Sequence, residues 1–581
     1  MKILFFFLSI VLVNAEWDTL HNLIDSEGYG YNALHATLLP DGMIMLLGFR
    51  NVLDDYSSCG QNQVCGSQNI AYILDTTNFS LHSMNYGGLG WEDGHTVCAG
   101  HTMLQNGDVI HFGGNGNADF VRYYSSSSNV FSMSKARRSP IGDLYYSTAT
   151  RIRNGLVFVY ANLLRGAAAS KPQYLNYATA LYDPRVDFEG GNPWEIFWNA
   201  SDTVNNHGPI LNTIGYTSVW TLKHPVTQND VVYDLAAIGD AYRFVFINSY
   251  NSSQTYMPEN GERPDLDGLA PGCTKQFGYQ SSVMLENGDL AIAGGCLGST
   301  ASHRIHVYNP TLDSWKTIEL GMARGFASFV LLPDGTALLM NGRSFSYFEG
   351  NPRVPQLINF TSGVVTNLIP EPQSSSTNYL RGYHNWAILL NDGRVLTGGG
   401  LEQGRKIGCE WQNARIFLPP YLINATRPVF VNFTLISMDT LSIYYEGIID
   451  RIVAMTLPSF THQIDTNMRL IRLEIISDDG HVLLARFPYD TEIILPGQYM
   501  IFLISDIGTP SISIMISFNV TDTHGYSETY SMFTTNPTAT CLSDPSTKNI
   551  IIISTVTIFS SILVILVVYC SRNRKLKETT V

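Results

Sequence analysis

Three residues of different chemical type occupy the same place in a repeated sequence pattern. Cys98, Tyr146 and His384 each lie nine residues before a glycine that belongs to a predicted two-residue turn. If the strands that start here line one central channel, a thiol, a phenol and an imidazole can converge on one point. Ordinary core packing explains any one of these residues alone, but a thiol, a phenol and an imidazole at one repeated position are an unusual combination for packing. The same count places Ala33, Tyr279 and Phe326 at the corresponding positions of other repeats.

Tyr383 stands directly before His384. Neighbours in a regular strand point to opposite faces, so both side chains could bind one ion only at a junction between loop and strand. The preceding Gly382 favours such a junction.

The two ends of the chain predict its compartment. Residues 1–15 hold one lysine, a short apolar run and a final alanine, which is typical of a cleaved secretory signal. Residues 550–570 carry no charge and are long enough to cross a bilayer, which predicts a transmembrane helix. The Lys- and Arg-rich tail 571–581 then lies in the cytoplasm. We therefore expect a single-pass type I protein of the cell membrane with its catalytic or binding part outside the cell.

An extracellular chain is expected to be glycosylated and to pair its cysteines. Seven Asn-x-Ser/Thr sequons fit this: Asn78, Asn199, Asn251, Asn359, Asn424, Asn432 and Asn519. Apart from Cys570 at the membrane edge, seven cysteines remain, which is an odd number. Cys59 and Cys65 can close a small disulfide loop, and Cys273 with Cys296 is a second candidate pair. The leftover cysteine indicates an intermolecular bridge or special chemistry.

Composition excludes one class of partner and favours one fold class. The net charge is -14, whereas a nucleic-acid-binding protein concentrates Lys and Arg. Hydrophobic residues make up 45% of the chain, and long amphipathic helical patterns are missing. The chain is therefore predicted to be all-β.

A repeated hairpin organises residues 16–418. Each unit has an apolar strand, a turn of the Asn-Gly or Asp-Gly kind and a second apolar strand. The turn glycines are Gly42, Gly107, Gly155, Gly288, Gly335 and Gly393. Their spacing of mostly about 50 to 60 residues is typical of kelch-type propeller blades. With a degenerate unit at 214–239, we predict a seven-bladed β-propeller, six or eight blades being the alternatives.

The repeat stops after residue 418, and short alternating strands follow. Residues 419–521 are predicted to form an immunoglobulin-like β-sandwich. Within it, His462 lies in a polar segment between strands, where a surface loop is the simplest expectation. Residues 522–549 are rich in Ser, Thr and Pro and are predicted to be a stalk.

Several motifs together resemble one known family. They are CAGHTMLQNGDVIHFGGN (residues 98–115), YYSTAT, RGYHNWAILLNDGRVLTGGG, PPYL, THQIDTN and GQYMIFLISDIGTPS. In order and spacing they are similar to the glyoxal oxidase and galactose oxidase family of copper radical oxidases. Glyoxal oxidase is the closer likeness, because no carbohydrate-binding domain precedes the propeller.

The resemblance implies a site with one copper ion. Its thioether would join Cys98 to Tyr146, Tyr383 would be the axial tyrosine, and His384 and His462 would be the histidine ligands. Tyr146 and Tyr383 would also bind the metal through oxygen, and His462 would reach the channel from the second domain. Imidazole and phenolate ligands suit Cu(II). Tyr145, Tyr279 and Phe326 would lie in the substrate pocket.

The resemblance also implies an activity. The protein would oxidise small aldehydes or primary alcohols with O2 and release H2O2, with Tyr383 as base and Tyr146 as the radical site. Two flanks depart from the family pattern, Asp143-Leu144-Tyr145 and Gln463-Ile464-Asp465, and they leave the substrate open. The alternative is an inactive, membrane-tethered propeller for adhesion or glycan binding. The terminal residues 578–581 also have the form of a ligand for a PDZ domain.

Overall fold

The structure is a computed structural model of the 581-residue chain. It describes residues 15–50, 68–84, 96–114, 119–153, 155–160, 179–198, 218–223, 230–234, 240–248, 251–262, 280–294, 301–312, 314–343, 353–373, 381–401, 412–437, 439–465, 467–488, 493–523 and 527–534. Several predictions lie outside these residues: the signal segment before Ala15, the transmembrane segment, the cytoplasmic tail, the Cys59–Cys65 disulfide and the second candidate pair of cysteines.

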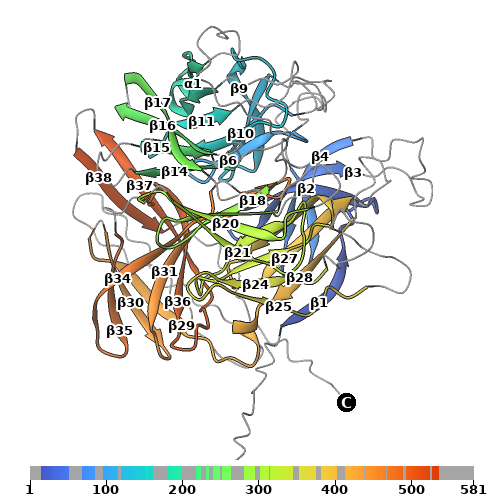
Figure 1. The fold of residues 1–581 in the computed structure, drawn as a ribbon, viewed down its shortest axis with the longest axis vertical. Coiled ribbons are helices and arrows are strands. Elements are labelled where there is room, and N and C mark those ends of the chain that lie inside the picture. The colour runs from blue at the N-terminus through green and yellow to red at the C-terminus, as the bar shows by residue number, and fades with distance from the viewer. Residues whose placement is uncertain are drawn as a thin grey trace, which may run out of the picture.

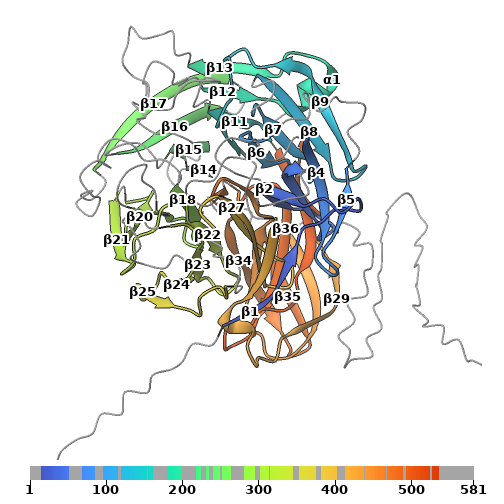
Figure 2. The same ribbon diagram turned by 90° about the vertical axis from the view of Figure 1, so that its right-hand side faces the viewer.

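Small antiparallel sheets surround a common axis in the first part of the chain (Figures 1 and 2). Six of them have four strands, and five of these six sheets are made of consecutive strands. The five are β6 (Gly100–Met103), β7 (Val109–Phe112), β8 (Phe120–Ser125) and β9 (Val130–Arg138); β10 (Thr148–Arg151), β11 (Val157–Tyr160), β12 (Thr179–Tyr182) and β13 (Trp194–Trp198); β14 (Val219–Lys223), β15 (Asp230–Asp234), β16 (Asp240–Asn248) and β17 (Asn251–Glu262); β18 (Gln280–Met284), β19 (Leu290–Gly294), β20 (Arg304–Asn309) and β21 (Ser314–Glu319); and β22 (Ser328–Leu331), β23 (Ala337–Met340), β24 (Gln356–Asn359) and β25 (Val364–Asn367). The sixth combines β1 (Glu16–Asn22) with β26 (Tyr383–Leu389), β27 (Val395–Leu401) and β28 (Asn413–Leu418).

The prediction of seven regular blades needs a correction. The propeller is confirmed, but the described residues form six regular four-stranded blades and one sheet of six strands. In that sheet β2 (Tyr31–Leu38), β3 (Ile44–Arg50), β4 (Gln68–Asp75) and β5 (Ser80–Ser83) are joined by a hairpin of β32 (Ser459–Thr461) and β33 (Ile464–Asp465). The hairpin comes from the C-terminal domain and pairs with β2, because the inner edge of β2 offers backbone groups that no blade strand occupies.

The turns follow the predicted chemistry. All six predicted turn glycines have φ between 80° and 90°, the left-handed region that such turns require. The degenerate unit is also a hairpin, since β14 pairs with β15 from Val219↔Asp234 to Lys223↔Asp230. The glycine-containing turns in the sequence therefore predict the positions of the inner strands correctly.

The first and last strands of the propeller lie in the same blade. β1 pairs antiparallel with β28, with Glu16 opposite Leu418 and Asn22 opposite Asn413. The ring is thus closed by hydrogen bonds between segments almost four hundred residues apart. This blade also contributes β26, which begins with two of the predicted site residues.

The C-terminal domain differs from a sandwich of two separate sheets. Its eight strands form one continuous sheet: β29 (Val429–Leu435), β30 (Thr440–Glu446), β35 (Val482–Arg486), β34 (Leu470–Asp478), β31 (Arg451–Thr456), β36 (Gly497–Ile504), β37 (Ile514–Thr523) and β38 (Ser527–Thr534). β34 is long enough to pair with β31 through its first half and with β35 through its second. The sheet folds over in this barrel-like way around a core that includes Ile452, Ile501 and Phe518.

The predicted stalk is also partly wrong. Residues 527–534 form β38, which pairs with β37 along its whole length, so the sheet extends beyond the expected boundary at 521. Among the described residues, the other regular elements are the short helix α1 (Pro184–Glu189) and the 3-10 helix η3 (Pro420–Leu422). In the part of the chain that the structure describes, no helix has the length and apolar character to cross a bilayer.

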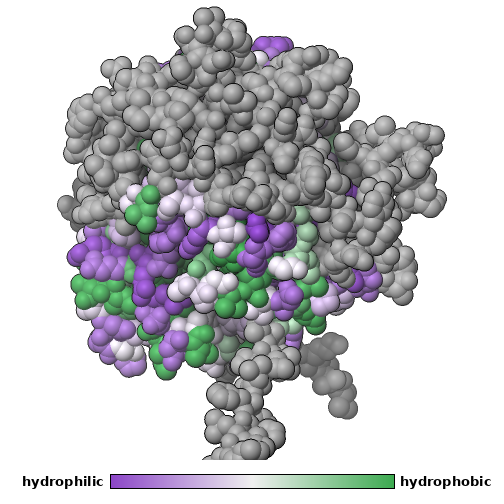
Figure 3. Space-filling model, viewed as in Figure 1, coloured by the Kyte–Doolittle hydropathy of each residue, from purple (hydrophilic) through white to green (hydrophobic). Residues whose placement is uncertain are grey.

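The described surface gives no continuous apolar face on the side shown in Figure 3, where hydrophobic residues are interspersed with hydrophilic ones. Among the sequons, Asn78, Asn359 and Asn424 are exposed and Asn432 is half-buried. Asn199 and the side chains of Asn251 and Asn519 lie outside the described residues. Glycosylation therefore stays a prediction.

Candidate active site

The equivalent positions of four repeats share an uncommon backbone conformation. Cys98, Tyr146, Phe326 and His384 have φ of 64°, 56°, 57° and 65°. Residues other than glycine rarely adopt this left-handed region, and each such residue costs about 1 to 3 kcal/mol. The repetition confirms that the spacing to the turn glycine identifies one structural position. Ala33 lies in regular strand β2 without this conformation, and Tyr279 is outside the described residues.

The left-handed turn at His384 explains how two adjacent residues face one centre. Tyr383 and His384 begin β26, and their ring centroids lie only 3.7 Å apart. In a regular strand they would point to opposite faces. The junction that the sequence required of this pair is therefore present.

His462 reaches the same centre from the other domain. It forms the two-residue turn of the β32–β33 hairpin together with Gln463, and both have positive φ, 48° and 74°. Such turns normally take Asn and Gly, so His and Gln here are strained. The hairpin lies against inner strands β2, β6, β18 and β26. His462 is completely buried, so the surface-loop expectation is wrong and the placement implied by the family resemblance is right.

The five predicted residues converge. The Sγ of Cys98 lies 3.6 Å from Nε2 of His462, and the rings of His384 and His462 are 4.6 Å apart at 89°. One ligand atom each from Cys98, His384 and His462 falls within 4.8 Å of the others. The hydroxyl groups of Tyr146 and Tyr383 form a short hydrogen bond with each other. Sulfur, imidazole nitrogens and phenol oxygens thus surround one buried point.

Cys98 and Tyr146 are also neighbours through the backbone. The N–H of Tyr146 donates to the carbonyl of Cys98 over 3.0 Å, which ties the entries of two adjacent blades together. Both side chains belong to one hydrophobic cluster, with Tyr145 and Tyr383 packed against it as partly buried members. The arrangement keeps the thiol and the phenol ring in the same small space.

The surroundings exclude water from most of the site. Leu34, Phe49, Val97, Phe326 and Ile464 complete the cluster around Cys98 and Tyr146. Tyr145 touches Tyr146 edge-on at 4.4 Å, and Phe326 lies 5.5 Å from the ring of Tyr383. Two of the three predicted pocket residues are therefore beside the site. The partly exposed rings of Tyr145 and Tyr383 mark the side from which a small molecule can approach.

Hydrogen bonding prepares His462 as a metal ligand. The hydroxyl of Thr461 lies 2.8 Å from Nδ1 of His462, which leaves Nε2 directed at the site. Burial lowers the pKa of His462 well below its usual value, and His384 lowers it further by charge repulsion. The ring is therefore neutral at pH 7, which is the form that binds metals.

Sequence reasoning missed the residues that hold these groups in place. The amide of Asn385 donates to the carbonyls of Phe326 (2.7 Å) and Gly382. The amide of Gln463 donates to the carbonyl of Asn385 over 3.3 Å and so links the hairpin to β26. Asn385 follows His384 directly, but nothing in its residue type predicts this role.

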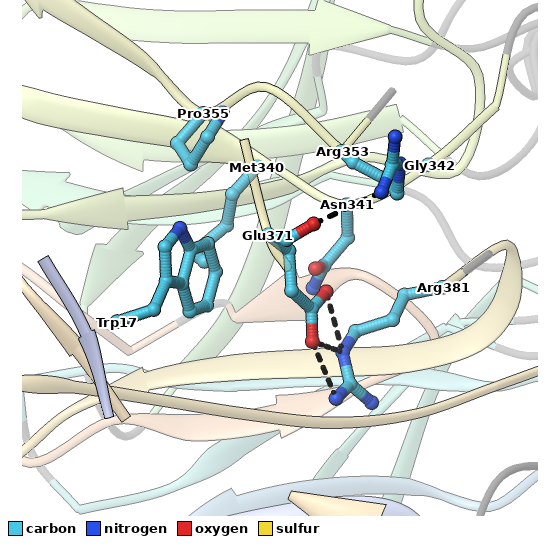
Figure 4. A pocket seen from close by; sticks show the side chains of 8 residues that line it. All are labelled: Trp17, Met340, Asn341, Gly342, Arg353, Pro355, Glu371 and Arg381. Carbon is cyan, nitrogen blue, oxygen red and sulfur yellow. Dashed lines mark hydrogen bonds and ion pairs between the residues drawn. The ribbon is translucent and has the colours of Figure 1, made fainter. Parts of the chain in front are cut away.

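A buried ion pair supports the same segment from behind. Arg381, two residues before Tyr383, donates to Glu371 over 2.9 Å, and both side chains are almost fully buried. They line a small cavity together with Trp17 and Met340, between the closing blade and the blade of β22–β25 (Figure 4). None of the five predicted site residues lines this cavity.

Comparisons with known proteins agree with this geometry. Residues 427–518 match the model of the galactose oxidase-like, Early set domain. A galactose oxidase of Gibberella zeae is 29% identical over 34% of the chain, and the alignment spans only 30% of that relative's length. An aldehyde oxidase of Arabidopsis thaliana, GLOX1, is 26% identical over 72% of the chain and 70% of its own length. These likenesses support a relationship of the chain to the glyoxal oxidase and galactose oxidase family.

The likeness extends to the fold of a solved structure. A fungal alcohol oxidase in complex with copper superposes with a TM-score of 0.65, covering 86% of the chain and 98% of that protein at 17% identity. The superposition supports the propeller and the C-terminal domain as one architecture.

Proposed function

We propose that the protein is a copper radical oxidase that oxidises small aldehydes or primary alcohols with O2 and releases H2O2. The observation that carries the proposal is the convergence of Cys98, Tyr146, Tyr383, His384 and His462 on one buried point from three blades and a second domain. Packing alone does not explain why so many strained positions carry redox-active or metal-binding groups.

The donor set fits copper. His384, His462, Tyr146 and Tyr383 offer imidazole nitrogens and phenol oxygens, which suit Cu(II). The Nε2 of His462 faces the group, and Thr461 holds its other nitrogen. Such an outer partner orients a ligand and fixes its tautomer. When bound, copper supplies one-electron redox chemistry at this position.

A second one-electron centre is needed, because oxidising an alcohol or aldehyde removes two electrons. The Cys98–Tyr146 pair supplies it if the sulfur bonds to the phenol ring, since a thioether makes the ring easier to oxidise. Forming that bond removes one hydrogen from the thiol and one from the ring, and O2 takes up the two hydrogens as H2O2. The closeness of the two residues supports this reaction.

The remaining residues divide the work of the reaction. Tyr383 takes the proton of the substrate hydroxyl, because it is the partly exposed phenol of the pair. The oxidised Tyr146 takes a hydrogen atom from the substrate carbon. An alcohol leaves as an aldehyde, or a hydrated aldehyde as a carboxylic acid, and O2 is reduced to H2O2. The apolar wall of Phe326 and Tyr145 favours small substrates.

Mass spectrometry of the purified protein tests the cofactor. After reduction, the peptides that contain Cys98 and Tyr146 should stay linked, with a mass two hydrogens below their sum. The Cys98→Ser variant is the control and should release both peptides. Separate peptides from active, copper-loaded protein would contradict the proposal.

An oxygen-uptake screen tests the activity. Copper-loaded protein should consume O2 with small aldehydes or primary alcohols and form an equal amount of H2O2. The alternative, a tethered ectodomain for adhesion or glycan binding, predicts neither uptake nor a peptide cross-link. The proposal includes the extracellular, membrane-anchored location, which surface labelling of intact cells checks.

A further inference from the structure

Three more buried histidines continue in a row from the active site. They are His35 on β2, His101 on β6 and His111 on β7, and none is more than 4% exposed. Ring centroids are separated by 5.4 Å from His462 to His35, 5.2 Å from His35 to His101 and 5.3 Å from His101 to His111. None of the three belongs to the predicted catalytic set.

Most nitrogens of this row have no protein partner. The Nδ1 of His101 lies 2.8 Å from the hydroxyl of Ser459. Its Nε2 and both ring nitrogens of His35 and His111 are buried without a hydrogen bond to any described group. Buried polar atoms are nearly always paired, because leaving them unpaired costs free energy. Five such atoms in one row point to a ligand.

The charge state of the rings suits a metal ion. Burial lowers the pKa of His101 to about 4 and that of His111 well below its usual value. Both rings are therefore neutral at pH 7, with lone pairs available. His101 is also prepared as a ligand, because Ser459 occupies Nδ1 and is itself hydrogen-bonded to Thr37 over 3.0 Å.

The spacing decides how many ligands an ion can find. A metal about 2 Å from a ring nitrogen lies about 3 Å from the ring centroid, so two rings that share an ion are about 5 to 6 Å apart. His35 and His101 meet this condition. In the described chain, only Cys98, His384 and His462 bring three ligand atoms together, so the row offers pairs. Zinc prefers four ligands, whereas monovalent copper accepts two.

Local charge selects the pair and the oxidation state. Arg122 is the cross-strand neighbour of His111 and is completely buried. Its charge disfavours a cation beside His111 and leaves His35 with His101 as the better pair. A monovalent ion also costs less to bury than a divalent one.

We propose that His35 and His101 bind a monovalent copper ion, forming a second copper site in which His35 is the ring next to the active-site ligand His462. The site does not depend on oxidase turnover. It lies directly beside the position at which the proposed oxidase would bind its active-site copper.

Copper stoichiometry tests the proposal. Metal-free protein is loaded anaerobically with monovalent copper under ascorbate, passed through a desalting column and analysed for metal by mass spectrometry. Wild-type protein should hold two ions per chain, and His101→Leu and His35→Leu one. His101→Gln, which keeps a hydrogen-bonding group beside Ser459, should also hold one. One ion in wild type with no change in these variants would overturn the proposal.

Controls separate this site from the catalytic one. His111→Leu should keep two ions, and loss of one there with retention in His35→Leu would refute the assigned pair. The double variant His384→Ala/His462→Ala should still hold one ion, with the X-ray absorption edge of monovalent copper. The Cu(II) electron paramagnetic resonance signal of the active site should be unchanged in His101→Leu. Failure of the oxidase activity alone leaves these results intact.

Discussion

The propeller and the C-terminal domain contribute to the active site in different ways. The propeller presents Cys98, Tyr146 and His384 from one structural position repeated in three blades, each at a left-handed residue before an inner strand. The C-terminal domain presents His462 from a single hairpin, which pairs with β2 of the propeller and not with the eight-stranded sheet of its own domain. One contribution is periodic and the other is unique.

This difference shows how the two parts keep their residues in place. The propeller positions are tied by hydrogen bonds between adjacent blades, such as that from the Tyr146 N–H to the Cys98 carbonyl. The hairpin is held internally, since the buried carboxylate of Asp465 accepts bonds from the backbone N–H groups of Ser459, Asn467 and Met468. The hairpin is therefore a preformed unit inserted into a ring.

The largest effect should come from removing one ligand of each kind. His384→Ala in the propeller and His462→Ala in the hairpin should both lower oxidase activity to the background of the metal-free protein, because each supplies a buried nitrogen to the same ion. Copper content and O2 uptake measure this. Phe326→Leu, at an equivalent position without a ligand, should keep its copper. Full copper occupancy in His462→Ala would show that the hairpin is not part of the centre.

Tyr383→Phe should have the next largest effect. Loss of the general base should lower turnover by about 10²- to 10⁴-fold, while the two histidines retain copper. Steady-state O2 uptake with an alcohol, together with metal analysis, checks the result. An unchanged turnover number would assign the proton transfer to another group.

Thr461→Val acts on the hairpin alone. Without the hydroxyl at Nδ1, the ring of His462 loses its fixed orientation, and copper affinity should fall by about 10- to 100-fold. Competition with a chelator of known affinity measures the change. Thr148→Val, a matched buried threonine in β10, should leave affinity unchanged. Equal losses in both variants would indicate a general packing defect.

The smallest effect is a pH dependence of stability specific to the hairpin. Burial raises the pKa of Asp465 to about 7, although its backbone hydrogen bonds act in the opposite direction. The folded protein then binds a proton that the unfolded chain has lost, so this contribution to stability is complete below about pH 4 and declines as pH rises to 7. Between pH 6 and 7 the free energy of unfolding should fall by about 1 kcal/mol.

Denaturant unfolding of the metal-free protein at both pH values measures this change. Asp465→Asn should remove that part of the pH dependence, because it has no proton to lose. If the free energy of unfolding rose from pH 6 to pH 7 by the same amount in the wild type and in Asp465→Asn, the assignment of this pH dependence to Asp465 would be contradicted.

The periodic half of the molecule was largely predictable from sequence. Turn glycines such as Gly107 and Gly393 identify the hairpins, and counting back nine residues finds Cys98 and His384. That count cannot show which edge of a blade remains open, so the six-stranded sheet was missed. The folded-over sheet of the C-terminal domain was also missed, because the division of β34 between two partners depends on its tertiary contacts.

The contribution of the C-terminal domain to the site was predictable only through family resemblance. By itself the polar segment around His462 predicts a surface loop, because burial there depends on the channel it enters. The supporting residues Asn385 and Gln463 have side chains that serve equally well at a surface. Their roles follow from contacts between segments far apart in sequence, which no local pattern records.

The pairing of β1 with β28 sets the order in which the protein can become reactive. During synthesis, the blade that carries Tyr383 and His384 cannot close until residue 418 has emerged, and His462 follows still later. An incomplete chain therefore holds Cys98 and Tyr146 apart from Tyr383, His384 and His462. In the proposed oxidase, radical chemistry would begin only in the finished molecule.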